Sequence, residues 1–489
     1  MNYKVVLNNI GNILKLEAVL MLLPLLVSLG YKENTYIYFL IPMAIALGLG
    51  FLLTIKKPDK KEYYAKEGLI IVGISWILLS IIGCLPFYLS KEIPSFVDSL
   101  FEMVSGFTTT GASVLKELDG VLSKGMLFWR SFSHWIGGMG IIVFILAFMP
   151  SSGRSIHILR AESPGPQVGK IVSKVKLSAR ILYVIYICMT IIQIVLLLCG
   201  GMHWFDAVTM SFGTAGTGGF SVNNAGFGGY SVYSQVVTTI FMFLFGMNFN
   251  VFFFLLIGSF RQALKCEEAY WYIGIAGVSI AVISCNLIFG SDNLLAMVPT
   301  VETIGTSIKD AAFQVVSVMT TTGYATADFT KWPALSQIIL FMLMFVGACA
   351  SSTGGGIKVS RIVIMIKNAF RQIKQLIRPN SVNNVRFEGQ KIDDALSKGV
   401  NTYFASIMII YAIVVLLISV DNKDFVTTLS AAAACLNNIG PGLGEVGPYG
   451  SFAEFSPFSK IILTIAMLIG RLEIFPLLVL FMPSTWKKI

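Results

Sequence analysis

The segment TTTGAS at residues 108–113 interrupts a strongly apolar part of the chain, and three later segments resemble it. These are AGTGGFS at 215–221, TTTGYAT at 320–326 and LNNIGPGLG at 436–444. When they are aligned on Gly111, Gly218, Gly323 and Gly440, their separations are 107, 105 and 117 residues. Four weakly similar loops at a nearly constant spacing predict four copies of one structural unit around a common axis.

The composition is that of a membrane protein. Hydrophobic residues make up 55% of the 489 residues, charged residues make up 13%, and the mean hydropathy is +0.77. Many apolar runs approach the roughly 20 residues that a membrane-spanning helix needs. A polar, glycine-containing backbone at membrane depth is tolerated only where it lines a watery cavity or is buried in protein. The four loops are therefore predicted to form the filter of a pore.

The apolar runs predict an all-α integral membrane protein with four pseudo-symmetric repeats of span, pore loop and span around one pore. Two extra N-terminal transmembrane helices precede them, at about 16–30 and 37–55. The spans that flank the four loops are 67–90 and 127–149, 181–200 and 234–258, 270–290 and 335–378, and 400–420 and 457–480. The corresponding division of the chain is 1–66, 67–180, 181–269, 270–398 and 399–489.

Basic residues predict the orientation. With the N-terminus inside, 26 of the 36 Lys and Arg residues fall in the inner segments 1–15, 56–66, 150–180, 259–269, 358–398 and 485–489. This is the positive-inside bias, and it predicts that both termini are cytoplasmic. The net charge of +10 therefore does not indicate nucleic-acid binding. The two basic clusters at 56–61 and 358–398 either anchor the topology or contact acidic lipid or an acidic partner protein.

A short amphipathic helix is predicted before each loop, opening near an acidic residue: Asp98, Asp206, Asp310 and Asp424. An aspartate at a helix start caps free N–H groups and suits the positive end of the helix dipole. The negative end of each helix then points at the loop, where it favours a cation. These aspartates either act only as caps or also attract ions at the outer mouth.

The residue types in the loops suit potassium. Potassium channels bind the ion with rings of backbone carbonyls that replace its hydration shell. Glycine permits the positive φ that turns carbonyls inward, and threonine can add a hydroxyl oxygen. The alternative is four glycine-rich packing corners in a secondary transporter. The predicted ion-binding residues are Thr109, Thr110, Gly111, Gly216, Thr217, Gly218, Thr321, Thr322, Gly323, Asn438, Ile439 and Gly440.

Together with SSTGGGIK at 351–358, GPGLG at 440–444 and GRLEIF at 470–475, the loops resemble the TrkH/KtrB superfamily of bacterial potassium uptake proteins. The two extra N-terminal spans are similar to the TrkH branch. The resemblance implies a multi-pass protein of the bacterial inner membrane, and a homodimer with a pore in each protomer. It also implies a cytosolic, TrkA-like ring of RCK-type subunits that alone bind the regulatory nucleotide. Gly216 stands where the family often has a hydroxyl residue.

Residues 347–358 (GACASSTGGGIK) interrupt the second span of the third repeat. A helix through three consecutive glycines would lose about 1 kcal/mol per glycine relative to alanine. We therefore expect a broken helix with a flexible loop, unlike the second spans of the other repeats. The resemblance implies that this loop obstructs the pore below the filter. The alternative is a close-packed crossing of small residues.

Arg471 lies within the predicted span 457–480, where an arginine costs about 2.5–3.5 to more than 10 kcal/mol. We expect it to face the pore and to bind carbonyls and hydroxyls of the loop, whereas Glu473 points to another helix face. The predicted gate residues are Gly347, Ser351, Ser352, Thr353, Gly354, Gly355, Gly356, Lys358 and Arg471.

The resulting hypothesis is potassium uptake, driven by the membrane potential and gated from the cytoplasm. The alternative is a K⁺/H⁺ or K⁺/Na⁺ symporter of the same fold. Intramembrane chains of acidic residues would favour proton coupling, but Asp98, Glu102 and Asp206 are scattered near the mouth. The sequence contains neither HExxH nor GxSxG, so an enzyme is not expected.

Overall fold

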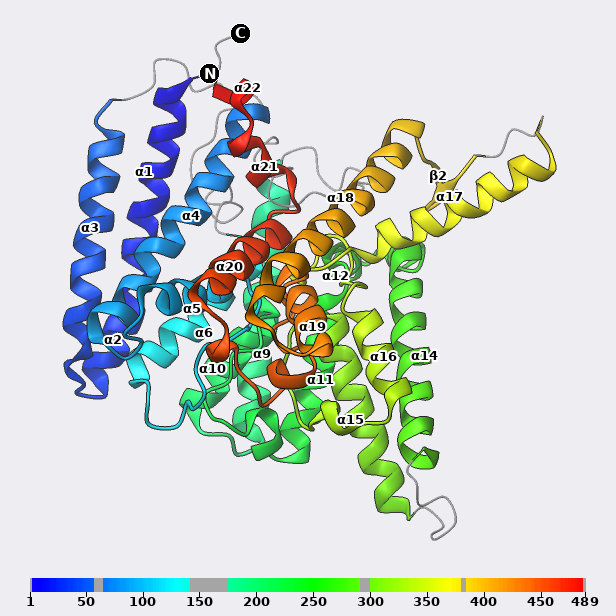
Figure 1. Cartoon of the computed structure of the whole chain (residues 1–489), viewed down its shortest axis with the longest axis horizontal. Coiled ribbons are helices and arrows are strands. Elements are labelled where there is room, and N and C mark those ends of the chain that lie inside the picture. The colour runs from blue at the N-terminus through cyan, green and yellow to red at the C-terminus, as the bar shows by residue number, and fades with distance from the viewer. Residues whose placement is uncertain (1, 57–64, 141–174, 291–299, 380–383, 487–489) are drawn as a thin grey trace.

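The computed structural model describes residues 2–56, 65–140, 175–290, 300–379 and 384–486. Figure 1 shows a helical protein in which the beginning of α1 and the short helix α22 (Pro483–Trp486) lie at the same end of the molecule. The N-terminal helices α1 (Tyr3–Leu20), α2 (Leu22–Gly30) and α3 (Ile37–Thr54) stand at one side, and α1 packs against α3. This layout confirms the predicted pair of extra N-terminal helices.

The first span begins earlier than predicted. Tyr3–Gly30 forms one apolar helical stretch, so residues 3–15 belong to the span rather than to an inner tail. The reason is close packing between α1 and α3. A Cβ atom added to Gly11 would lie 2.8 Å from the carbonyl oxygen of Gly50. Lys15 enters the same contact and donates a 2.6 Å hydrogen bond to Thr54.

Six helices of the described residues are long and apolar enough to cross a membrane, or seven if one bent pair is counted as a span. The assignment follows from length and composition. The six are Tyr3–Gly30, Asn34–Thr54, Lys66–Ser90, Arg180–Cys199, Glu267–Phe289 and Asp394–Asp421. The chain is accordingly a multi-pass membrane protein, as predicted.

Each repeat contains a long first helix, a shorter helix, a polar loop and a second helix. The first helices are α4 (Ala65–Ser90), α9 (Val175–Cys199), α14 (Glu267–Phe289) and α18 (Asp394–Ile418). The shorter helices are α5 (Phe96–Phe107), α10 (Trp204–Gly216), α15 (Val301–Met319) and α19 (Phe425–Leu436). The second helices are α6 (Lys124–Gly138), α11 (Val232–Gly246), α16 (Ala334–Leu343) and α20 (Pro457–Arg471). Neighbouring repeats pack through α6 with α10, α11 with α15, and α20 with α5.

The second helices of repeats two, three and four are all interrupted. After α11 the chain bends by 93° into α12 (Phe249–Leu256). After α16 it forms the loop 344–358 and continues as α17 (Val359–Ile377), and after α20 it continues as α21 (Phe475–Phe481). The broken third repeat was predicted correctly. The prediction that only this repeat is broken was wrong, as were the single spans 234–258 and 457–480.

Identifiable residues cause the two unexpected breaks. Asn248 accepts a hydrogen bond from the N–H of Asn250 and so starts α12 as a new helix. After α20, Glu473 and Ile474 adopt positive φ angles of 50° and 73°, which end the helix.

In the first repeat, residues 141–149 of the predicted span 127–149 lie outside the described residues, as do Lys57, Lys60 and Lys61 of the first basic cluster.

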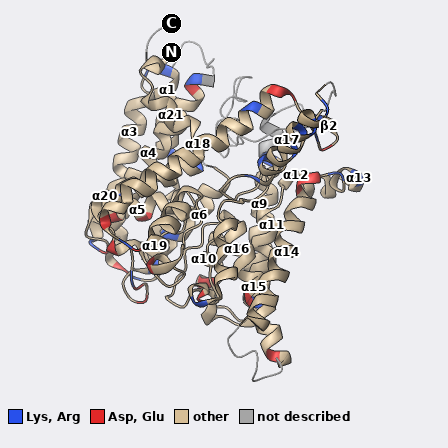
Figure 2. Cartoon of the chain, turned by 45° about the vertical axis from the view of Figure 1, so that its right-hand side comes forward, with Lys and Arg blue, Asp and Glu red and all other residues tan. Residues whose placement is uncertain are grey.

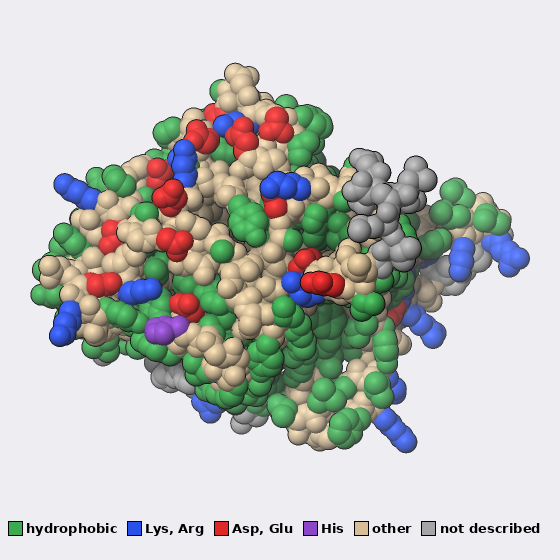
Figure 3. Space-filling view, turned by 90° about the horizontal axis from the view of Figure 1, so that it is seen from below, with side chains coloured by type: hydrophobic (Ala, Val, Ile, Leu, Met, Phe, Trp, Pro, Cys, Tyr) green, Lys and Arg blue, Asp and Glu red, His purple; other side chains and the backbone are tan. Residues whose placement is uncertain are grey.

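A small hairpin beyond α17 was not predicted. Strands β1 (Arg386–Phe387) and β2 (Gln390–Lys391) pair antiparallel around a turn with positive φ at Glu388 and Gly389. Figure 2 shows Lys and Arg positions, in blue, along α17 and near β2. Short helices α13 (Phe260–Ala263) and α22 (Pro483–Trp486) complete the fold. The opposite face, seen from below in Figure 3, carries many Asp and Glu side chains.

Candidate functional site

The four loops share one backbone pattern. In each loop a residue with φ between 55° and 58° is followed, two positions later, by a glycine with φ between 77° and 99°. The first residues are Thr109, Thr217, Thr321 and Asn438, and the glycines are Gly111, Gly219, Gly323 and Gly440. Threonine and asparagine hold the first position, whereas the second needs glycine because its φ is larger and a Cβ atom there would overlap the backbone of another loop.

This pattern corrects the register of the second loop. The aligned glycine is Gly219 and not Gly218, so the triplet is 217–219. Gly216 is the last residue of α10 and stands outside the triplet. The absence of a hydroxyl at Gly216 therefore leaves the triplet unchanged, because Thr217 supplies the threonine of this loop.

The loops close into a ring in chain order. Each positive-φ glycine packs against the carbonyl oxygen of the middle residue in the next loop, and the fourth glycine packs against the first loop. A Cβ atom added to Gly111 would lie 2.0 Å from Gly218 O, and one added to Gly219 would lie 2.0 Å from Thr322 O. A Cβ atom added to Gly323 would lie 2.1 Å from Ile439 O, and one added to Gly440 would lie 2.7 Å from Thr110 O. We call these four carbonyl oxygens the carbonyl ring.

The carbonyl ring is available to a ligand. In the described part of the chain, none of its four oxygens accepts a hydrogen bond. Some neighbouring hydroxyls are engaged with each other, since Thr108 contacts Thr110 at 2.8 Å and Thr320 contacts Thr322 at 2.7 Å, whereas the buried Thr109 hydroxyl has no hydrogen-bond partner among the described residues. Asn438 donates to the Thr110 hydroxyl at 2.9 Å, which ties the fourth loop to the first. The arrangement therefore offers four backbone oxygens and, in the first loop, the hydroxyl of Thr109.

The helices α5, α10, α15 and α19 end directly at the loops, so the negative ends of their dipoles point at the carbonyl ring. The predicted aspartate caps are mostly wrong. Ser95, His203 and Thr300 cap the first three helices, and only Asp424 is itself a cap. Asp310 lies inside α15, which begins nine residues before it.

His134 explains why the second loop has glycine in its middle position. Its Nδ1 atom lies 2.9 Å from the carbonyl oxygen of Gly106, which fixes the ring behind the loop. A Cβ atom added to Gly218 would lie 2.1 Å from this nitrogen. At the same middle position, the other three loops have Thr110, Thr322 and Ile439. Sequence reasoning missed His134, because an isolated histidine in an apolar helix gives no signal of its partner.

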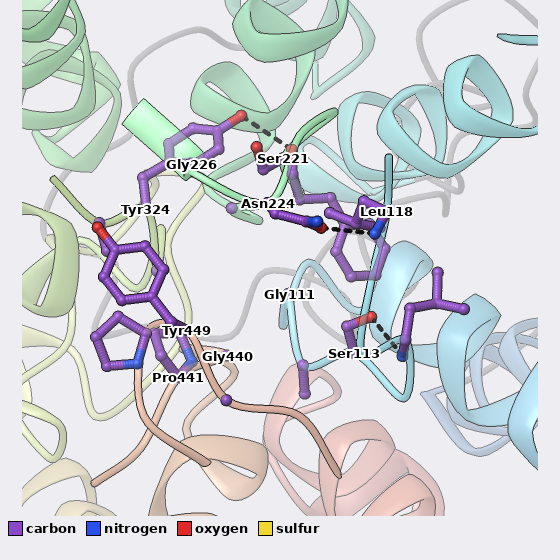
Figure 4. A pocket seen from close by; sticks show the side chains of 18 of the residues that line it. Gly111, Ser113, Leu118, Ser221, Asn224, Gly226, Tyr324, Gly440, Pro441 and Tyr449 are labelled. Atoms are coloured by element: carbon purple, nitrogen blue, oxygen red, sulfur yellow. Dashed lines mark hydrogen bonds between the residues drawn. The ribbon is translucent and has the colours of Figure 1, made fainter. Parts of the chain in front are cut away.

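A cavity of about 260 Å³ opens on one side of the carbonyl ring. Gly111, Gly219, Gly323 and Gly440 line its floor, and Figure 4 shows Ser113, Ser221, Asn224, Tyr324 and Tyr449 around it. All four repeats thus contribute to one cavity. The walls carry hydroxyl, amide and phenol groups, together with the basic side chains of Lys116 and Arg130, which pair with Glu454 and Glu102.

A buried ion pair braces the wall of this cavity. Glu102 accepts hydrogen bonds from Arg130 Nε at 2.6 Å and from the Ser113 hydroxyl and the Val114 N–H, both at 3.0 Å. Arg130 also donates to the carbonyl oxygen of Ser221 at 2.9 Å. The pair therefore joins the first loop to the second. Sequence reasoning did not identify Arg130.

The intramembrane loop (residues 344–358) lies at the other end of the triplets. The Gly355 N–H donates to the Thr321 hydroxyl at 2.6 Å, and a Cβ atom on Gly355 would lie 2.8 Å from Asn437 O. The Cys349 N–H donates to Gly246 O at 3.0 Å at the end of α11. The loop thus contacts elements of repeats two, three and four directly beside the carbonyl ring.

The intramembrane loop folds back on itself. The Gly347 N–H donates to Ile357 O at 2.9 Å, and Gly356 has φ +66° where it passes the Gly347 backbone. Ser351 has φ +59°, and the Ser352 hydroxyl donates to Cys349 O at 2.6 Å. Lys358, just before α17, donates from its buried ammonium group to Gly354 O.

Arg471 connects the intramembrane loop to the first repeat. Its guanidinium donates to Thr353 O at 2.9 Å and to Gly138 O at 2.7 Å, and it also reaches Gly137 O. The predicted contact with loop carbonyls is present. Arg471 ends α20, however, rather than lying within a continuous helix. Glu473 pairs instead with Arg361 at the start of α17.

Comparisons with known proteins agree with this architecture. The profile of the TrkH family, described as cation transport protein, matches residues 34–488. The Trk system potassium uptake protein TrkH of Salmonella typhimurium is 35% identical over 495 residues, covering 100% of both chains. TrkH of Escherichia coli K12 is 34% identical over the same length, again with 100% of both chains covered.

A solved structure is similar over the whole chain. The crystal structure of the potassium transporter TrkH from Vibrio parahaemolyticus superimposes with a TM-score of 0.87 at 32% identity, and it covers 100% of both chains. These relatives are named as transporters and not as enzymes. The predicted fold and family are therefore confirmed, and the chain belongs to the TrkH family of cation transport proteins.

Proposed function

We propose that this chain takes up potassium ions through the carbonyl ring. The observation that supports the proposal is the closed packing of glycine against carbonyl through all four loops, which presents four backbone oxygens with no hydrogen-bond donor among the described residues. Such oxygens can replace the hydration shell of potassium. The relatives named above are potassium uptake proteins, which is consistent with this ion.

With the corrected register, the proposed ion site consists of the triplets Thr109–Thr110–Gly111, Thr217–Gly218–Gly219, Thr321–Thr322–Gly323 and Asn438–Ile439–Gly440. Potassium is the transported ion and not a resident cofactor. The ion is stabilised by the carbonyl oxygens and by the C-terminal ends of four helices. The carboxylates of the outer face would raise the local cation concentration.

We propose that the intramembrane loop is the gate and that Arg471 holds it closed. The loop touches Thr321 and the backbone of Asn437, next to the triplets, and Arg471 ties it to the end of α6. These contacts would place a positive charge and a folded segment in the path of an ion that has passed the carbonyl ring. Opening would then require the loop to leave this position.

The division of the chain into an N-terminal pair and four repeats remains part of the proposal. So do the homodimer, the cytosolic TrkA-like ring with its nucleotide, the cytoplasmic termini and the bacterial inner membrane. Two features support a cytosolic partner. The relatives are named as proteins of a Trk system. Helix α17 follows directly after the intramembrane loop and carries the basic residues Lys367, Arg371 and Lys374.

Uptake of a rubidium tracer tests the proposed function. The chain is expressed in bacteria that lack their own potassium uptake systems, and tracer entry is measured with competing potassium or sodium. Potassium should compete strongly and sodium weakly. Equal competition by both ions would contradict the potassium assignment. Uptake that needs an inward sodium or proton gradient would favour the symporter instead.

A further inference from the structure

Glu268 lies at the start of α14, far from the carbonyl ring in sequence, and its side chain is 1% exposed. Its carboxylate is nevertheless well satisfied. Oε1 accepts hydrogen bonds from the N–H groups of Ala350 at 2.8 Å and Ser360 at 2.9 Å. Oε2 accepts one from the Asn248 side-chain amide at 2.9 Å. A buried carboxylate with three donors is a strong and specific contact.

The first two donors flank the centre of the intramembrane loop. Ala350 comes before the segment that contacts Thr321 and Arg471, and Ser360 comes directly after it in the first turn of α17. One oxygen atom therefore holds both arms of the loop together. Removal of this oxygen would release two backbone N–H groups in a buried place.

The same carboxylate also completes the start of α17. Lys358, the N-cap residue, makes no side-chain hydrogen bond to this helix. The N–H groups of Val359 and Arg361 find backbone acceptors, and that of Ser360 needs another acceptor. An anion at a helix N-terminus is favoured by the helix dipole. The carboxylate of Glu268, on α14, is such an anion. By accepting a hydrogen bond from Asn248, Glu268 also contacts the bend between α11 and α12.

We infer that Glu268 is the positioning residue that keeps the intramembrane loop in place; the consequence for ion flow rests on the proposed function of that loop as a gate. Arg471 binds the loop through Thr353 O, and Glu268 binds Ala350 before that residue and Ser360 just after the loop. The two side chains come from different repeats and carry opposite charges. They constitute separate anchors of one segment.

The adjacent residue provides a matched control. Glu267 is about 29% exposed and pairs with Lys367 of α17, and it accepts a hydrogen bond from the N–H of Glu388 at 3.2 Å. These contacts are to α17 and the β1–β2 hairpin. Glu267→Gln and Glu268→Gln remove the same charge from neighbouring positions, but only Glu268 accepts hydrogen bonds from Ala350 and Ser360.

The experiment compares the wild-type chain, Glu268→Gln, Glu268→Asp and Glu267→Gln in lipid nanodiscs by hydrogen exchange. Peptides that cover 344–361 report on the loop. Glu268→Gln should increase their exchange rate by about tenfold or more, because the bonds to a charged acceptor are replaced by weaker neutral ones. Glu268→Asp should give a smaller increase, and Glu267→Gln should leave this peptide unchanged.

Unchanged exchange in Glu268→Gln, or an equal increase in Glu267→Gln, would overturn the inference. If Glu268→Gln does not yield folded protein, the Glu268→Asp result decides by the same criterion. Potassium flux from liposomes is measured on the same variants and should rise with the exchange rate. Faster exchange with wild-type flux would support Glu268 as the anchor and contradict the gate itself, so the two ideas fail separately.

Discussion

Replacement of Gly323 by alanine should disturb the carbonyl ring more than the fold. Gly323 has φ +81°, and an L-residue in this region costs roughly 1–2 kcal/mol. Its Cβ atom would lie 2.1 Å from Ile439 O, whereas ordinary contacts begin at 3.4 Å, so the oxygen must move by about 1.3 Å. Weakening one charge–dipole contact by about 1.4 kcal/mol changes relative binding about tenfold. We therefore expect the preference for potassium over sodium to fall at least about tenfold.

Gly120 provides the control for this substitution. It has φ +78°, but a Cβ atom added there meets no atom within 4 Å. Gly120→Ala thus carries the same backbone cost without the clash. Tracer uptake with potassium and sodium competition is measured for both variants, together with the amount of folded protein in the membrane. Wild-type selectivity in Gly323→Ala, or an equal loss in Gly120→Ala, would refute the role of the ring.

Three further predictions concern the gate, the cavity wall and a helix cap. Arg471→Ala should raise potassium flux from liposomes, and its effect should not add fully to that of a shortened intramembrane loop, because residues of one network couple; full additivity would separate the two. Arg130→Ala leaves Glu102 buried without its partner and should cost about 3–5 kcal/mol, seen as a lower melting temperature, whereas an unchanged value would show that the pair is dispensable. Asp424 lies outside the membrane-spanning helices, and the hydrogen bond from Thr427 lowers the pKa of its carboxyl group more than burial raises it. The ionised carboxylate therefore stabilises the folded protein above its ordinary pKa of about 3.9, and this stabilisation is lost as the pH falls below that value. Thermal melts between pH 6 and pH 3 should therefore show a larger loss for wild type than for Asp424→Asn, and parallel curves would count against this cap.

The repeats could be predicted from the sequence because apolar runs and polar loops alternate with a long period. The register of the second loop could not. The segment 215–221 contains glycines at 216, 218 and 219, and near-constant spacing gave no reason to choose Gly219. The choice depends on which glycine packs against Thr322 O in the next repeat, and this contact joins residues about 100 positions apart.

The breaks in the second helices were also hidden in part. Three consecutive glycines made the loop of repeat three visible, whereas the bend after α11 has only the single glycine Gly246, followed by Met247 and Asn248, in an otherwise apolar run. The contact of Arg471 with a loop carbonyl was predicted because the cost of a buried charge demands acceptors. Its partners on α6 and the anchoring role that we infer for Glu268 depend on tertiary packing, which no local pattern records.

We propose that the four loops form a passive, potassium-selective path. The most direct measurement is the membrane potential at which net cation flux through the purified protein in liposomes becomes zero. With unequal potassium on the two sides, this potential should follow the potassium gradient and should stay unchanged when a pH gradient is imposed. It should respond only weakly to a sodium gradient. A zero-flux potential that moves with the pH gradient, or follows sodium as closely as potassium, would contradict the account.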